Sequence, residues 1–454
     1  MAQAPSAVQA GTLDPTFAEE GVLTLPTPDL TGYRTLAILP LAENKLLITV
    51  LLPGDPAPIR LAKVNEDGSL DMAFGGAGTG LVEFSIKNTD LEVYQLSGLD
   101  DGGWLVIGQF SSFEQSGAYV VRFLEDGRLN TLFGEDGVRL LPYRSEPRAE
   151  DREDGPATFS RRDREPSAGD ARSSGNQGVS AVVQSDGKIV LPSWVEFGTS
   201  PGQWAVLRLN PDGSTDDTFN GSGFVVIELP GIPRTPTSIR SVVLQADGQV
   251  LVCGEYSSQD TPDSNGIYVI RLDVTGRLDT SFNGGVGVVT VANPTFMNAN
   301  AMALRERDDA IVVVGDVWRD QYRHGLMFVL SRDGFFDFAF NSGQPLFSKW
   351  VDQGHDWYRC AWQADGSILV GGSTGRGVVE EGVSALTARF RSDGSPDLTF
   401  NDVGFVLFDE EGQYETVEDM ALMPDGRIVV GGFARLPGPV WSRIVGSWII
   451  RYLA

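Results

Sequence analysis

The chain repeats the motif Gly-x-x-Asp-x-x-Phe seven times, and this repeat constrains its fold more than any other feature. The seven copies run from Gly11 to Phe17, Gly68 to Phe74, Gly127 to Phe133, Gly213 to Phe219, Gly276 to Phe282, Gly334 to Phe340 and Gly394 to Phe400. Successive phenylalanines are 57, 59, 86, 63, 58 and 60 residues apart. The chain is therefore a series of similar modules, with one large insertion in the third step.

Each module is predicted to contain four short antiparallel strands, and residues 238–291 show them best. Two apolar stretches, 241–245 and 249–253, flank an Asp247-Gly248 pair, which is typical of a tight hairpin turn. An alternating stretch at 267–273 predicts a third strand, and residues 287–291, after the motif, predict a fourth. We name these strands A to D in chain order.

The two ends of the chain indicate how the modules are arranged. Residues 11–25 supply a motif and a D strand, and residues 417–454 supply A, B and C strands without a D strand. The two fragments complete one module, and radial closure protects sheet edges. We therefore predict an all-β fold: a seven-bladed β-propeller with four antiparallel strands per blade, closed by the N-terminal strand joining the C-terminal blade. The predicted blades are 33–84, 90–141, 178–229, 238–291, 298–350, 355–408, and 415–454 with 11–25.

Two segments differ from the rest of this single predicted domain, which spans 11–454. Residues 1–10 are predicted to be a disordered N-terminus. Residues 142–177, inserted between blades two and three, are also predicted to be disordered, because they are rich in charged residues and nearly lack large apolar side chains. The alternative for this insertion is a partner-binding strap or a protease-sensitive switch.

Composition excludes several classes of function. The formal charge of −26 disfavours binding to nucleic acid and to anionic lipid. No apolar run is long enough to span a membrane, so membrane insertion is not expected. The first ten residues lack the basic and apolar regions of a signal peptide. The two cysteines, Cys253 and Cys360, fall in different modules and are expected to be free thiols.

Most modules also carry a basic residue five positions before the motif glycine. These residues are Lys63, Arg122, Arg208, Arg271 and Arg389, and Arg451 holds the equivalent position in the last module. Each is predicted to pair with the motif aspartate while the motif phenylalanine packs between blades. The motifs lack the distal bidentate glutamate of a calcium loop, so we expect neither a metal nor a cofactor.

The phrases DGSTDDTFN, TGRLDTSFN and DGSPDLTFN, together with hairpins such as QADGQVLVCGEY, resemble the delta-sixty repeat of bacterial β-propeller proteins. The resemblance covers nearly the whole chain except the first ten residues and the insertion. Asn130 and the aromatic pair Phe335-Phe336 depart from the pattern. The resemblance implies a scaffold of secreted or surface-associated bacterial proteins with few defined activities. It favours export by a non-classical route over a cytoplasmic location.

Function is expected where the repeat is broken. The A–B and C–D connections are alike in all modules, whereas the B–C and D–A connections vary and lie on the opposite face. On that face, blade five offers Asp316, Trp318, Arg319, Asp320, Tyr322 and His324. The entry to blade six adds His355, Asp356 and Trp357, and blade four adds Glu255 and Tyr256. Aromatic planes among polar groups suit the recognition of sugars or peptides.

We predict a non-enzymatic, monomeric binding or scaffold propeller that presents this variable face to a carbohydrate or a protein partner. One alternative is a polysaccharide hydrolase or lyase that uses His355 and the acids facing it. Another is a purely architectural domain of a larger assembly. The chain has only two histidines, and neither lies in a nucleophile, zinc or phosphate-loop signature, so no catalytic residue is assigned.

Overall fold

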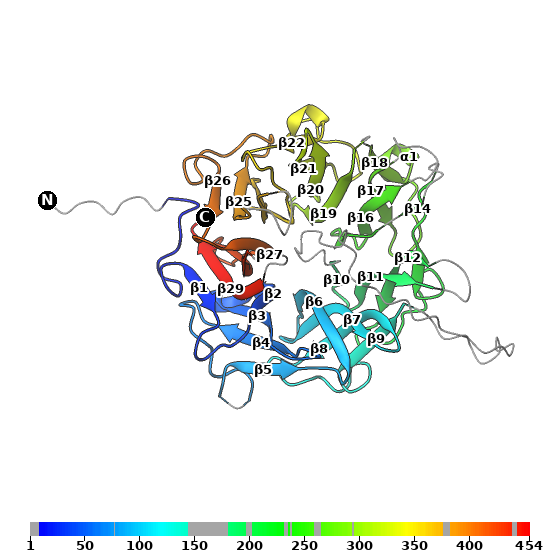
Figure 1. Cartoon of the computed structure of the whole chain (residues 1–454). Coiled ribbons are helices and arrows are strands. Elements are labelled where there is room, and N and C mark those ends of the chain that lie inside the picture. Colours follow the sequence, from blue (N-terminus) through cyan, green and yellow to red (C-terminus); the bar gives the residue numbers. More distant parts are fainter. Residues whose placement is uncertain are drawn as a thin grey trace.

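The computed structural model describes residues 9–76, 78–143, 180–196, 202–230, 235–236, 238–257, 265–292, 295–375, 382–437 and 443–454. Seven antiparallel sheets stand around one axis (Figure 1), which confirms the predicted seven-bladed propeller. The segments predicted to be disordered, 1–10 and 142–177, lie outside the described residues apart from their ends.

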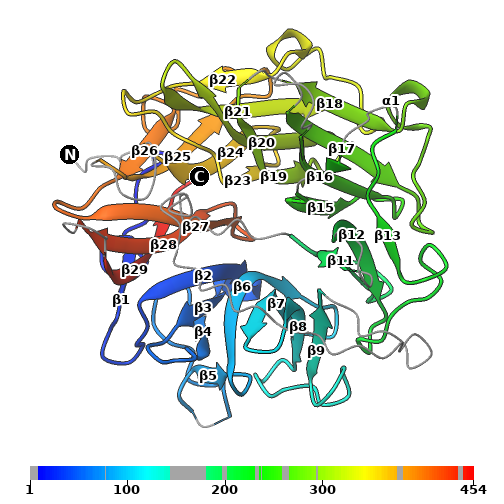
Figure 2. The same ribbon diagram turned by 45° about the vertical axis from the view of Figure 1, so that its right-hand side comes forward.

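The first strand of each blade lies nearest the axis and the fourth lies at the rim (Figure 2). Blade one contains β2 (Arg34–Pro40), β3 (Leu46–Leu51), β4 (Ile59–Val64) and β5 (Leu81–Phe84). Blade two contains β6 (Thr89–Gly98), β7 (Trp104–Ser112), β8 (Ser116–Phe123) and β9 (Val138–Pro142). Blade three contains β10 (Val182–Val183), β11 (Ile189–Val195), β12 (Gln203–Leu209) and β13 (Phe224–Val226).

In blade four the first strand is split into β14 (Thr235–Pro236) and β15 (Ser241–Leu244), followed by β16 (Val250–Ser257), β17 (Gly266–Leu272) and β18 (Val288–Ala292). Blade five contains β19 (Met297–Leu304), β20 (Ile311–Arg319), β21 (Tyr322–Leu330) and β22 (Leu346–Ser348). Blade six contains β23 (Arg359–Trp362), β24 (Ile368–Ser373), β25 (Ala385–Phe390) and β26 (Phe405–Phe408). Single helical turns stand at Ala42–Asn44, at Phe282–Gly285 (α1) and at Asn341–Gly343.

Blade seven joins the two ends of the chain. It contains β27 (Tyr414–Leu422), β28 (Ile428–Leu436), β29 (Arg443–Tyr452) and, at its rim, β1 (Val22–Leu25). Strand β1 pairs antiparallel with β29, where Val22 lies opposite Ile450. The N-terminal strand therefore supplies the edge that the C-terminal blade lacks, and the closure predicted from the sequence is consistent with this pairing.

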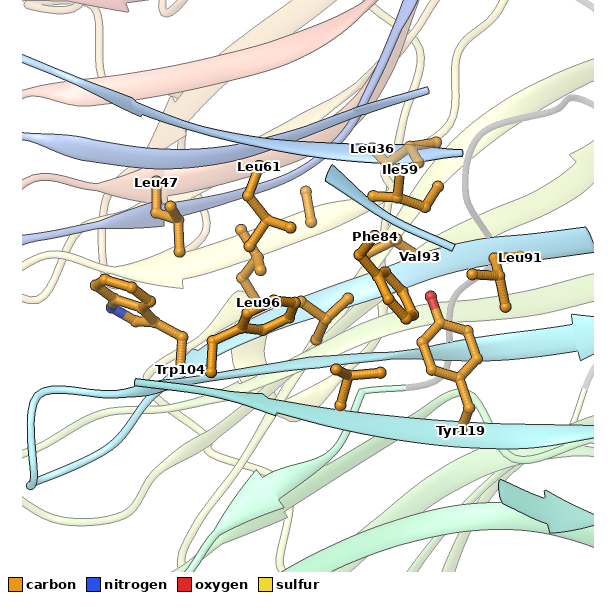
Figure 3. Close-up of a cluster of buried hydrophobic side chains, with 14 of the residues drawn as sticks. Leu36, Leu47, Ile59, Leu61, Phe84, Leu91, Val93, Leu96, Trp104 and Tyr119 are labelled. Atoms are coloured by element: carbon orange, nitrogen blue, oxygen red, sulfur yellow. The ribbon is translucent and has the colours of Figure 1, made fainter. Parts of the chain in front are cut away.

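The apolar core lies between neighbouring blades. Figure 3 shows Leu47 and Leu61 of blade one above Leu96 and Trp104 of blade two, and all four side chains are buried. This packing follows from the alternation in each strand, because both faces of a blade are covered by its two neighbours.

The repeated motif forms a corner that locks each blade to the next. The seven motif phenylalanines are buried. An ideal Cβ atom on Gly127 would lie 2.7 Å from the Phe74 ring of the preceding blade, and one on Gly276 would lie 2.7 Å from the Phe219 ring. Both glycines also have a positive φ, near 85°. The motif therefore needs glycine for backbone conformation and for space.

The predicted ion pairs at these corners are confirmed in most blades. Four arginines reach the motif aspartate: Arg208 to Asp216 at 2.6 Å, Arg271 to Asp279 at 2.8 Å, Arg389 to Asp397 at 2.7 Å, and Arg451 to Asp14 at 2.8 Å. Lys63 lies 3.9 Å from Asp71. The prediction is wrong for Arg122, because Asn130 offers no charge and the guanidinium pairs with Asp101 at 2.6 Å instead.

These arginines also connect blades. The Arg208 guanidinium lies over the Phe219 ring at 4.6 Å and donates to the carbonyl oxygen of Val274, in the next blade, at 2.7 Å. Arg451 repeats the arrangement with Phe17 and the carbonyl oxygen of Glu66. Each such corner therefore holds aspartate, arginine and phenylalanine in one stack that spans the blade boundary.

Replacing Asp216 by Ala is expected to lower the free energy of unfolding by about 3 kcal/mol, because Arg208 is buried and would lose its carboxylate. Asp337→Ala is the matched control: its blade carries Val329 in place of the base, and the turn bond from the Ala339 amide is lost in the same way. Urea unfolding of both variants measures the difference. A calcium-dependent rise of several degrees in the melting temperature of the natural protein would replace this interpretation with a metal site.

Both cysteines are free thiols, as predicted. In the described ranges, no group of three or more His, Cys, Asp or Glu side chains is placed to hold a metal ion. None of the helical segments described there has the length and apolar character needed to cross a membrane.

Candidate functional site

The strand ends that lead into the B–C and D–A connections lie on one face of the propeller, which we call the loop face. Near this face the first strand carries a β-bulge in blades one, two, five and seven. A glycine in the second strand makes room for the bulge: an ideal Cβ on Gly108 would lie 1.8 Å from the carbonyl oxygen of Glu92, and one on Gly315 would lie 1.9 Å from that of Asn298. Bulge and glycine coincide in blades two, five and seven, whereas Val50 holds the position of the glycine in blade one.

The bulge in blades two and five, and the break between β14 and β15 in blade four, bring a side chain of the first strand against the residue that follows the glycine in the second strand. The pairs are Tyr94 with Gln109 in blade two, Arg240 with Glu255 in blade four, and Asn300 with Asp316 in blade five. We call these the loop-face pairs. Each pair is polar, and its second-strand member is buried in blade four (Glu255) and in blade five (Asp316).

A hollow of about 320 Å³ opens on the loop face between blades two, three and four. Its aromatic walls are Tyr94, Tyr143 and Trp204, and its polar groups come from Gln109, Ser193, Ser238 and Arg240. The sequence analysis missed all seven as site residues. The available signal was at the irregular position of the first strand, where blades two and four carry Tyr94 and Arg240 while blade one carries Leu36.

The walls of the hollow are held by contacts within each blade. Trp204 packs edge to face against Trp194, with ring centroids 5.6 Å apart. The Tyr94 hydroxyl donates to the side-chain carbonyl of Gln109. Burial raises the pKa of Tyr143 to about 12, and the charge of Glu92 acts in the same direction. The Tyr143 hydroxyl therefore keeps its proton at neutral pH.

Glu255, one of the predicted ligand-binding residues, contacts Arg240 on the side away from the hollow. The Nε of Arg240 lies 3.2 Å from both carboxylate oxygens of Glu255. The same carboxylate accepts from the Ser238 hydroxyl and, at 3.1 Å, from the Ala299 backbone amide. It is buried and does not line the hollow. Tyr256 is also buried, in the apolar core next to blade three.

The predicted loop of blade five is a regular hairpin. Strand β20 continues to Arg319 and β21 starts at Tyr322, so only Asp320 and Gln321 form the turn, with φ of 49° and 70°. Trp318 is 40% exposed, and Arg319 and Asp320 are exposed as well. Tyr322 and His324 are half-buried. Of the predicted residues, this hairpin alone presents an aromatic ring to solvent.

His355 and Trp357, offered by the sequence as ligand-binding candidates on the variable face, are fully buried. The Trp357 indole N–H donates to the Ser348 hydroxyl at 3.2 Å, and the His355 Nε2 lies 3.0 Å from the same oxygen. Burial lowers the pKa of His355 to about 3, so its ring is neutral. Both rings belong to the packing between blades five and six.

The predicted acids Asp316 and Asp356 do meet, around Arg323. Its Nη1 donates to Asp356 at 2.8 Å, and its Nε lies 3.9 Å from Asp316. Burial raises the pKa of Asp356 to about 6, although the charge of Arg323 opposes the rise. Both residues are 3% exposed. This cluster joins blades five and six, and its acids do not reach solvent.

The fold and the hollow define a β-propeller with a candidate binding site on its loop face. In four segments, 99–133, 184–219, 245–282 and 363–400, the chain matches a family described as a β-propeller domain of unknown function, DUF5122. The four segments cover less than half of the chain, and each ends at a motif phenylalanine. A comparison with curated proteins found no match.

Several solved structures are similar to the chain. The polysaccharide lyase Uly1 has 10% identity and a TM-score of 0.47, with 99% of this chain and 94% of that chain covered. An ulvan lyase from a new polysaccharide lyase family has 9% identity and a TM-score of 0.47, with 93% and 94% covered. Drosophila Plexin A in complex with Semaphorin 1b has 8% identity and a TM-score of 0.43, with 97% and 88% covered. At such identities the likeness concerns the fold alone.

Proposed function

We propose that the protein is a non-enzymatic binding propeller that holds a carbohydrate in the hollow between blades two, three and four. The observation that carries this proposal is the presence of three aromatic rings and several hydrogen-bonding groups in one hollow of about 320 Å³. An aromatic face stacks on the apolar face of a sugar ring, while polar groups bind its hydroxyls. The volume falls in the range of small-ligand sites.

The burial and the hydrogen bonds of the predicted catalytic groups favour a binding function over a polysaccharide hydrolase or lyase. A general acid or base must come within about 3 Å of the proton that it transfers. Asp316 and Asp356 are buried and bonded to Asn298, Ser373 and Arg323. His355 is buried against two tryptophans, Trp350 and Trp357. These side chains are buried and bonded to other residues of the protein, so they are not placed to exchange a proton with a substrate.

We further propose that the modules are delta-sixty repeats and that the protein acts as a monomer. The first point is supported by the matched family segments, each of which starts near an A–B hairpin and ends at the motif phenylalanine. The second is supported by the closure of the ring within one chain through β1 and β29.

Trp204→Ala is expected to weaken carbohydrate binding by about 2 kcal/mol, or roughly 30-fold in Kd, because it removes the largest aromatic wall of the hollow. The ligand is first found on an array of plant, algal and microbial glycans, and affinities are then measured by calorimetry. Trp318→Ala, which removes an exposed tryptophan from the same face in blade five, is the control and should leave the affinity unchanged.

Other outcomes contradict the proposal in different ways. Loss of binding in Trp318→Ala alone would place the site on the blade-five hairpin. New chain ends released from a bound polysaccharide would show catalysis. Binding that neither substitution affects would place the site outside the loop-face hollow.

A further inference from the structure

The charge of the hollow differs from that of the protein around it. The chain has a formal charge of −26. Among the described residues that line the hollow, Arg240 is the one that carries a charge, and it is positive. The nearby acid Glu92 does not line the hollow; its side chain is 46% exposed and its carboxylate lies 3.7 Å from Arg34. Among the described residues, a ligand in the hollow therefore contacts one charged side chain, Arg240, whose charge is balanced from behind by Glu255 at 3.2 Å.

Arg240 is held in position before any ligand arrives. It occupies the gap between β14 and β15, where the first strand of blade four is split. Its Nε edge contacts Glu255, and two other donors, Ser238 and the Ala299 amide, fix that carboxylate in turn. A guanidinium oriented in this way loses little conformational entropy when it binds a partner.

Two neutral groups of the hollow can also donate to an acidic ligand. The side-chain carbonyl of Gln109 is occupied by the Tyr94 hydroxyl, which leaves the amide nitrogen of Gln109 as a donor. The Ser238 hydroxyl is not a donor to the ligand, because its proton goes to Glu255. The Tyr143 hydroxyl remains protonated at neutral pH and can donate.

We infer that the sugar bound in the hollow carries a carboxylate, as a uronic acid does, and that Arg240 is the residue that binds it. This inference rests on the proposed function and specifies its ligand class. Guanidinium and carboxylate are matched in shape and form charge-assisted hydrogen bonds. The aromatic walls then contact the sugar ring while Arg240 selects the acidic group.

The test uses pairs of ligands that differ only in the charge. Oligosaccharides of galacturonate and of glucuronate are compared with the same oligosaccharides after carboxyl reduction, which converts each carboxylate to a hydroxymethyl group. The full-length protein is expected to bind one of the acids about 30-fold more tightly than its reduced form. Arg240→Gln should remove this preference and leave the affinity for the reduced form within about twofold.

Two further variants separate charge from structure. Arg240→Lys keeps the charge but loses the planar fork, and should retain part of the preference. Arg319→Gln removes an exposed arginine from the same face, in blade five, and should change nothing. Thermal melting of each variant shows whether it is folded, and the comparison of ligands on the unsubstituted protein does not depend on any variant.

Each outcome has a distinct meaning. Equal affinity for the acidic and the reduced sugar, with binding that still needs Trp204, would overturn the carboxylate inference and leave the proposed function standing. Tighter binding of a sulfated neutral sugar than of any uronate would also overturn it. The absence of Trp204-dependent binding to any sugar would overturn the proposed function itself.

Discussion

Deletion of residues 1–25 is expected to remove more than about 5 kcal/mol of folding free energy, which is comparable with the whole stability of many domains. The deletion removes β1 from the edge of blade seven. It also removes the buried side chains of Phe17 and Leu25, worth about 1.5–3 kcal/mol each. Arg451, fully buried, would lose its only motif carboxylate, Asp14. The truncated protein should melt far lower and aggregate through the open strand edge.

Circular dichroism melting and size-exclusion chromatography measure these two effects. Deletion of residues 1–8 alone is the control, since it leaves in place every contact of Asp14, Phe17 and β1 named above. An unchanged melting temperature after deletion of 1–25 would show that β1 does not stabilise blade seven, contrary to the pairing of Val22 with Ile450.

The architecture could be predicted from the sequence because each module forms the same corner, with the same local constraints on residue type. A corner with a positive φ and no room for a side chain selects glycine, as at Gly127 and Gly276. The same corner needs a buried Phe ring and an Asp–Arg pair stacked on it. The three residue types therefore recur at fixed spacing. Seven copies of such a constraint, together with two complementary chain ends, leave few folds open.

For the candidate site, the sequence predicted the face of the propeller but not the residues that line the hollow. Its walls come from three blades, and no local pattern shows that Tyr94, Trp204 and Arg240 border one hollow. Tyr94 is turned toward this face by the bulge of blade two, and Arg240 by the break between β14 and β15. Both irregularities depend on pairing between strands, which the sequence does not display. In blade five, the turn pair Asp320-Gln321 contains no glycine. The sequence therefore carries no signal for a tight hairpin there.

Exposure of aromatic residues was the other point at which sequence reasoning failed. Trp318 and Trp357 both lie outside the repeat pattern and near the same face, yet the first is exposed and the second fully buried. The difference lies in a neighbour: an ideal Cβ on Gly325 would lie 2.1 Å from the Trp357 Nε1, so this glycine of β21 makes room for the indole. A requirement of that kind links residues far apart in the chain and has no local signature.

Trp357→Ala is accordingly expected to lower the free energy of unfolding by about 3–5 kcal/mol, because it empties a fully enclosed site. The indole packs against Trp350, with ring centroids 5.8 Å apart, and against His355, at 4.5 Å. Its loss also takes the indole donor from Ser348. Trp318→Ala, on the exposed hairpin, should change the stability by less than about 1 kcal/mol.

Urea unfolding followed by circular dichroism compares the two variants under the same conditions, and calorimetry with the glycan bound by the natural protein adds a second measurement. Trp357→Ala should keep its affinity wherever it remains folded, because the indole lies between blades five and six and the hollow lies between blades two, three and four. Equal losses of stability in both variants would mean that Trp318 is packed rather than exposed. A loss of affinity in Trp357→Ala with unchanged stability would return the binding site to blades five and six, where the sequence first placed it.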